Sequence, residues 1–200
     1  NRRLWATTRG IKTLEPVPII NPTLANWRVQ LEECKRRQPL HAVRLMPTFH
    51  NYGPAHPRLK LCMAELARAE IKIILQIRVE DERNRYFGLM VVGLAEADVD
   101  EFLRRFARQT VLCVGLYHGE IVRLAAQHEN FLADISFAES FTTLDTLREK
   151  LSARRLVFGS CCPILSVAAQ TAKVRLTGLS RRECEQIAAG NVRRFLSGLL

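Results

Sequence analysis

Two kinds of segment, which differ in the spacing of their apolar positions, alternate along the 200-residue chain. Short, mostly apolar runs are each followed by a stretch in which apolar residues recur every three or four positions, which is typical of a helix. The runs predict strands near residues 17–21, 42–47, 71–78, 111–116, 131–136 and 155–159. Because no long polar linker separates these strand–helix pairs, the pattern predicts an α/β protein built on a parallel sheet.

The ends of several helices carry local signals. Pro57 fits the first turn of a helix, and Pro163 opens a helical pattern directly after the last strand. Ser180 and Glu183 have the spacing of a capping box for the closing helix, for which Gly190 is the predicted end. No glycine-rich nucleotide-binding motif follows any of the strands, which argues against a nucleotide-binding sheet. The pattern by itself leaves a barrel and a doubly wound sheet open.

Length and composition indicate one globular domain over residues 1–200. Hydrophobic residues make up 48% of the chain, which is enough for a sizeable core. No apolar run approaches the ~18 residues of a membrane span, and no signal-peptide pattern opens the chain. We therefore expect a cytoplasmic protein with no membrane partner. The six cysteines form no C-x-x-C pair, so reduced and mostly buried thiols are expected rather than a zinc ribbon.

The net charge of +10 raises the question of nucleic-acid binding. Nucleic-acid-binding proteins gather basic residues on one face and interleave aromatic residues that stack on bases. Here the arginines are spread over successive helices, and aromatic residues make up only 7% of the chain. We therefore expect a solvated, arginine-rich surface and no nucleic-acid partner. A steep salt dependence of DNA binding would indicate the opposite.

Three stretches carry motifs that occur in a fixed order. "PVPIINPTLANW" has an Asn-Pro pair before a helix, and "AVRLMPTFHNYG" has a strand that ends in Pro with His and Gly beyond it. "RRLVFGSCCP" is followed by a closing helix that contains Ile187, Gly190, Asn191 and Arg194. These stretches resemble the third strand, the fourth strand, and the eighth strand with closing helix of the amidohydrolase-related family of metal-dependent hydrolases. The resemblance covers nearly all of the chain.

The resemblance implies a TIM (β/α)8-type barrel, of which about six of the eight strand–helix units are present. On this alignment the chain is a single amidohydrolase-like barrel domain that is incomplete at its N-terminus, because strands one and two are not seen. A barrel of eight strands cannot close with six. The family's metal-binding His-x-His belongs to strand one. We therefore assign no cofactor, and zinc is implied only if a His-x-His lies upstream of Asn1.

The family's other metal positions are not filled in the usual way. Strand five of the family supplies a histidine, whereas the corresponding run here contains Gln76 and Arg78. The aspartate that follows strand eight in the family corresponds to Cys161. A thiolate could bind zinc but would be a poor proton acceptor, so the metal site is interpreted as lost and no metal ligand is assigned. Cys161 and His50, which lies in the fourth-strand motif, are the catalytic candidates.

Polar residues at the ends of the predicted strands indicate what kind of ligand the barrel binds. Arg44, Gln76, Arg78 and Ser160 are the substrate-binding candidates, since an arginine in a barrel mouth suits a carboxylate. In the simpler alternative, Glu80 and Asp81 form salt bridges with these arginines.

We therefore expect a hydrolase or decarboxylase that acts on a small carboxylated or cyclic substrate. The alternative is a non-catalytic barrel that binds an anionic small molecule or a partner protein. A homo-oligomer is compatible with either.

Overall fold

Five parallel strands form the centre of the structure, a computed structural model that describes residues 1–37, 39–84 and 91–197. The strands follow one another in sequence order, and each pairs in parallel with the next. They are β1 (Ala42–Leu45), β2 (Lys72–Gln76), β3 (Val111–Val114), β4 (Phe131–Asp134) and β5 (Leu156–Val157). Sequential parallel order with intervening helices is the arrangement of a (β/α) barrel, and it confirms the predicted parallel sheet.

The first predicted strand, near residues 17–21, contributes a single bridge rather than a ladder. Ile19 pairs in parallel with Arg44. The N–H of Ile20 donates to the backbone oxygen of Arg44 at 3.1 Å, and the N–H of Arg44 donates to that of Pro18 at 2.9 Å. The segment therefore lies beside β1, although it forms only this short contact in place of the predicted strand.

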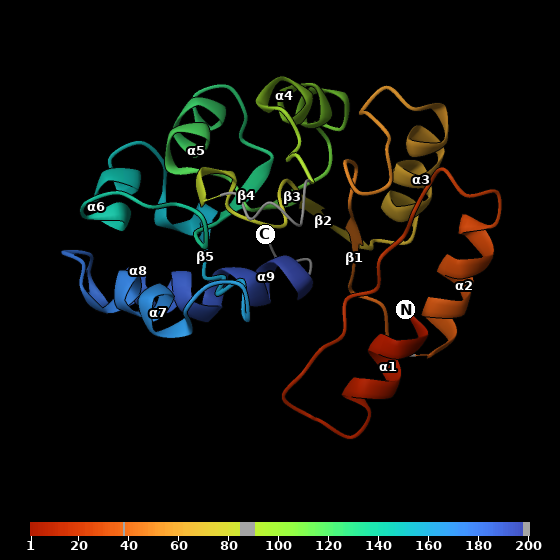
Figure 1. The fold of residues 1–200 in the computed structure, drawn as a ribbon, viewed down its shortest axis with the longest axis horizontal. Coiled ribbons are helices and arrows are strands. Elements are labelled where there is room, and N and C mark those ends of the chain that lie inside the picture. Colours follow the sequence, from red (N-terminus) through yellow and green to blue (C-terminus); the bar gives the residue numbers. More distant parts are fainter. Residues whose placement is uncertain (38, 85–90, 198–200) are drawn as a thin grey trace.

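Helices surround the sheet on more than one side. Figure 1 shows α3, α4, α5 and α6 along one side, and α7, α8 and α9 on another. Their bounds are α1 (Arg2–Thr8), α2 (Trp27–Arg37), α3 (Pro57–Arg68), α4 (Glu96–Arg105), α5 (His118–Ala125), α6 (Thr143–Arg148), α7 (Val167–Arg175), α8 (Arg181–Glu185) and α9 (Asn191–Ser197). Short helical turns cover Glu82–Asn84, Ala153–Arg155 and Gln186–Gly190.

Side chains of the strands alternate between two apolar clusters, because successive residues of a strand point to opposite faces. The larger cluster packs the outward face of the sheet against the surrounding helices. The smaller cluster, which we call the inward layer, takes one residue from each strand and one from α9. Its buried members are Ala42, Ile74, Leu112, Leu132, Val157 and Phe195.

The helix signals were correct in two places and wrong in two. Pro57 begins α3, and Ser180 and Glu183 form the predicted capping box at α8. However, α7 begins at Val167 rather than near Pro163, because Ser166 is its N-cap.

Gly190 does not end the closing helix, since a π-helical segment leads through it into α9. The amide of the buried Asn191 explains this continuation. It donates to the backbone oxygens of Ala153 at 2.8 Å and Leu156 at 2.7 Å, which ties the helix to β5.

All six cysteines are free thiols, but only half of them are buried. Cys34, Cys62 and Cys113 lie in the core. Cys161 and Cys184 are half-buried and Cys162 is exposed, so the expectation of mostly buried thiols is correct for three of the six. In the described part of the chain, no helix has the length and apolar character needed to cross a membrane.

Candidate functional site

A cavity of about 630 Å³ lies at the carboxyl ends of the parallel strands, and we call it the strand-end cavity. Arg44 of β1, Gln76 at the end of β2 and Asp134 at the end of β4 line it, together with segment 158–162 after β5. Its apolar wall extends the inward layer and includes Val17, Ile74, Leu112, Val114, Val157 and Val192. Because functional groups of α/β barrels gather at the carboxyl ends of the strands, this cavity is the candidate site.

The cation of the strand-end cavity is Arg44. Its Nη1 donates to Oε1 of Gln76, and Nε2 of Gln76 donates in turn to the backbone oxygen of Arg78 at 2.5 Å. Within residues 1–37, 39–84 and 91–197, no carboxylate forms an ion pair with Arg44. Burial lowers the pKa of Arg44, whereas Asp134 and Cys161 raise it. The guanidinium is therefore available to an anionic ligand.

Two acids line the cavity: Glu15, which is exposed, and Asp134, whose side chain is almost fully buried. Its Oδ1 accepts hydrogen bonds from the hydroxyl of Ser136, from the N–H of Ser136 at 3.1 Å and from the N–H of Gly115 at 3.4 Å. Burial raises the pKa of Asp134, although these bonds and the charge of Lys173 act in the opposite direction. The three bonds fix one carboxyl oxygen, and the other, Oδ2, faces Gly159.

Segment 158–162 adds a hydroxyl and a thiol to the cavity wall. Oγ of Ser160 accepts a hydrogen bond from the N–H of Cys162 at 3.3 Å. Cys161 has a φ of 47°, in the left-handed region that non-glycine residues rarely adopt. Burial and the neighbouring Asp134 raise the pKa of the Cys161 thiol, while Arg44 lowers it. The protonated thiol is favoured, which makes Cys161 a weak nucleophile.

Arg78 does not line the cavity. Its guanidinium forms a two-bond ion pair with Glu120 of α5, at 2.7 Å and 2.8 Å, and lies 3.9 Å from the ring centroid of Tyr117. Its Nη1 also donates to the backbone oxygen of Gly115 at 2.5 Å. The acid that pairs with Arg78 is therefore Glu120, and not Glu80 or Asp81, which were the partners in the simpler alternative.

His50 also lies outside the cavity wall. Its ring stacks on that of Tyr52, with 6.4 Å between the centroids, and meets the edge of Phe49 at 6.0 Å. Its Nδ1 is buried without a hydrogen-bond partner among the described residues. Burial lowers the pKa of His50, so the neutral ring is favoured. The structure gives His50 an aromatic packing environment.

The structure regroups the predicted site. It brings Arg44, Gln76, Ser160 and Cys161 together, and it places His50 and Arg78 elsewhere. Asp134 was missed, although one signal could have found it. Asp134 is the last residue of the buried strand β4, just as Gln76 is the last residue of β2. The same positional rule would have placed its carboxyl group at the cavity.

The donors in the described residues do not fit the divalent metal that the family resemblance implies. No three His, Cys, Asp or Glu side chains gather into a metal-binding set in the described part of the chain. Oδ1 of Asp134 already accepts three hydrogen bonds, and burial favours the thiol form of Cys161. The Arg44 guanidinium also opposes a cation at this place. We therefore derive no chemistry through a metal from these residues.

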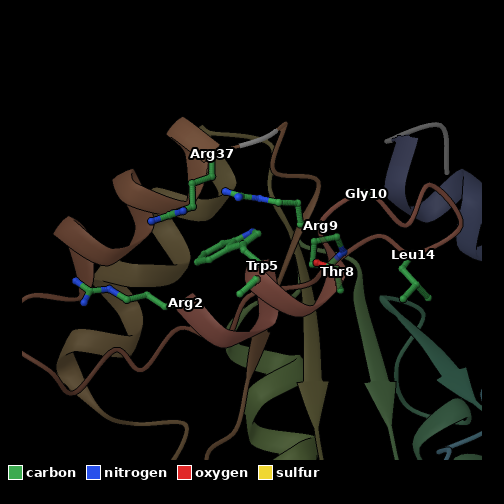
Figure 2. A pocket seen from close by; sticks show the side chains of 9 residues that line it. Arg2, Trp5, Thr8, Arg9, Gly10, Leu14 and Arg37 are labelled. Carbon is green, nitrogen blue, oxygen red and sulfur yellow. The ribbon is translucent and has the colours of Figure 1, made fainter.

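A second cavity, of about 600 Å³, lies beside α1 and the end of α2. Figure 2 shows Arg2, Arg9 and Arg37 around Trp5, and the guanidinium of Arg37 lies 5.1 Å from the centroid of the Trp5 ring. Among the described residues that line this cavity there is no acidic side chain and no thiol. The strand-end cavity, in contrast, combines an arginine with acid and thiol groups.

Comparisons with known proteins give different results for sequence and for structure. No protein-family model and no curated protein sequence matches the chain. A structure of an uncharacterised TIM-barrel protein from Bordetella bronchiseptica matches with a TM-score of 0.73 and 16% identity, over 99% of this chain and 72% of that one. The 5-carboxyvanillate decarboxylase LigW from Sphingomonas paucimobilis matches with a TM-score of 0.74 and 15% identity, over 98% and 70%.

A third structure has a bound metal and an inhibitor. It is a dihydroxybenzoic acid decarboxylase from Polaromonas sp. JS666 with manganese and 2-nitroresorcinol, and it matches with a TM-score of 0.62 and 13% identity, over 88% of this chain and 66% of that one. At these identities the likeness concerns the fold. The chain has the fold of TIM-barrel proteins, and the similar structures include decarboxylases and a putative amidohydrolase from Staphylococcus aureus.

Proposed function

We propose that the chain binds a small carboxylated aromatic or cyclic compound in the strand-end cavity and acts on it as a decarboxylase or hydrolase of the amidohydrolase kind. The observation that carries this proposal is the Arg44 guanidinium. It lines an apolar-walled cavity and hydrogen-bonds to a neutral amide, with no ion pair to any described carboxylate. An arginine in this state binds a ligand carboxylate through two parallel hydrogen bonds.

The rest of the cavity suits the remaining parts of such a ligand. The apolar side chains of Ile74, Leu112 and Val114 offer a surface for a ring. Loss of CO2 from a carboxylate leaves an electron pair on carbon, which must then take up a proton. Asp134 is an acid in the cavity whose raised pKa favours the protonated form needed for this transfer. The named decarboxylases among similar structures support this reaction class.

A second candidate function is binding of an anionic small molecule without catalysis. The presence of Arg44 beside Asp134 and Cys161 favours it, since a cation there suits an anion and not a metal. Both candidates use the same arginine in the same cavity. They differ only in whether the bound compound is converted.

Calorimetry with benzoate and benzamide tests the shared binding step. We expect benzoate to bind and benzamide, which lacks the charge, to bind at least about tenfold more weakly. Arg44→Gln should lose this preference, whereas Arg68→Gln, at a side chain 74% exposed on α3, should keep it. Absence of benzoate binding by the unmodified chain would contradict the proposal.

Release of CO2 from a panel of carboxylated aromatic compounds then separates the two candidates. We expect CO2 to be released, and we expect this release to depend on Arg44. Binding without release of CO2 would select the non-catalytic function.

A further inference from the structure

We propose that Arg78 is a positioning residue that holds two ionisable groups of the strand-end cavity, Arg44 and Asp134, in their places. The inference rests on the proposed function of that cavity. Arg78 itself is 4% exposed and does not line the cavity. It acts through two routes, one from its backbone and one from its side chain.

The backbone route leads to Arg44. The carbonyl oxygen of Arg78 accepts the amide Nε2–H of Gln76 at 2.5 Å. Because the nitrogen end of the amide is held there, its oxygen end is turned toward Arg44, whose Nη1 donates to it. The orientation of Gln76, and with it the guanidinium of Arg44, depends on the position of the Arg78 peptide group.

The side-chain route leads to Asp134. Nη1 of Arg78 donates to the carbonyl oxygen of Gly115 at 2.5 Å, and the N–H of Gly115 donates to Oδ1 of Asp134 at 3.4 Å. Gly115 has a φ of +89°, and a Cβ at this position would lie 2.9 Å from the backbone oxygen of Arg78. This close approach is open only to glycine, so Arg78 and Gly115 fix each other's backbone.

Helix α5 anchors Arg78 itself. Glu120 receives two hydrogen bonds from the guanidinium and a third from the N–H of Tyr117 at 2.8 Å. The ring of Tyr117 covers the guanidinium. A planar fork can bond Glu120 and Gly115 at once, whereas a lysine ammonium lacks this geometry. Through the pair of Arg78 and Glu120, the positions of Arg44 and Asp134 therefore depend on the position of α5.

The test compares Arg78→Lys with a matched control, Arg155→Lys. Arg155 has a side chain that is only 12% exposed, pairs with Glu129 at 3.1 Å and lies 4.7 Å from the centroid of the Phe131 ring. It sits at the amino end of β4, away from the cavity. Three quantities are measured in each variant: the unfolding midpoint, the affinity for benzoate, and the titration of the Asp134 carboxyl carbon by NMR.

We expect both variants to lose thermal stability. Only Arg78→Lys should weaken benzoate binding, by about tenfold or more, and shift the titration of Asp134. Unchanged affinity and titration in Arg78→Lys would overturn the inference.

If Arg78→Lys does not fold, Glu120→Gln provides the same comparison, because it keeps one acceptor for the guanidinium. If the unmodified chain does not bind benzoate, the proposed function fails, while the titration of Asp134 still decides the positioning role.

Discussion

Oδ2 of Asp134 occupies the space that a side chain at Gly159 would need, since a Cβ built at Gly159 would lie 1.5 Å from this oxygen. The end of β4 and the turn after β5 are therefore in direct contact at the cavity. The carboxyl group is held from two sides, by the hydrogen bonds to its Oδ1 and by the backbone of Gly159.

We expect Gly159→Ala to displace Asp134 and to lower the free energy of unfolding by about 1–3 kcal/mol, because overpacking and a disturbed buried acceptor act together. Urea unfolding measures this change. Gly53→Ala is the control, since a Cβ there meets no atom within 4 Å. Equal effects of the two substitutions would show that the contact between Gly159 and Asp134 has no energetic importance.

Gln76→Glu should abolish the preference of the cavity for anions. The substitution places a carboxylate where a neutral amide now accepts from Arg44, so an internal ion pair replaces the charge offered to a ligand. Calorimetry should show benzoate binding weakened by about tenfold or more. Gln127→Glu, at an exposed position just after α5, should leave the affinity unchanged. Tighter binding in Gln76→Glu would refute this account of Arg44.

The stability of the folded chain should depend on pH through the ionisation of Asp134. Burial raises its pKa above the ordinary value of 3.8, so the folded chain binds this proton more tightly than the unfolded chain. The resulting stabilisation is complete below 3.8 and is lost as the pH rises through the raised pKa. In Asp134→Asn this loss is absent, so the variant should gain stability relative to the unmodified chain between acidic and neutral pH.

Urea unfolding at several pH values measures this difference. The control is Glu149→Gln at an exposed position, whose profile should run parallel to that of the unmodified chain. A parallel profile for Asp134→Asn as well would contradict the raised pKa.

Thiol labelling should distinguish the cysteines by burial. Cys162 is exposed and should react first in the native state, whereas Cys34, Cys62 and Cys113 should react only after unfolding. Burial raises the pKa of Cys62 to about 12, which suppresses its thiolate as well as its access. Mass spectrometry of the labelled peptides locates each site. Benzoate should slow labelling of Cys161, which lines the cavity, and should not affect Cys184.

Much of the fold could be predicted from the sequence because buried parallel strands leave nearly continuous apolar runs, such as the one that contains β2. The helix after β5 was harder, because Pro163 resembles a first-turn residue although Ser166 caps the helix. Gly190 was wrongly predicted as the end of the closing helix. The helix continues through it, and the next residue, Asn191, bonds to Ala153 and Leu156, which are distant in sequence.

The site was only partly predictable, because some of its contacts join residues that are distant in sequence. Arg44 and Gln76 could be found because strand ends project into a common region. The role of Arg78 could not be found, because Glu120 lies 42 residues further along the chain and on a helix. A local pattern shows that an arginine is present, but not which acid it meets. Asp134 could have been found by the positional rule that identified Gln76.

The sequential order of the strands has a consequence for how a ligand would affect the chain as a whole. The walls of the strand-end cavity come from all five strands, β1 to β5, and the turn after β5, so a bound molecule touches structural units far apart in sequence. Such a molecule would stabilise the folded arrangement of all these units, since separating any of them requires its release. Proteases that cut the connecting loops would then be slowed together, including at loops that the molecule never contacts.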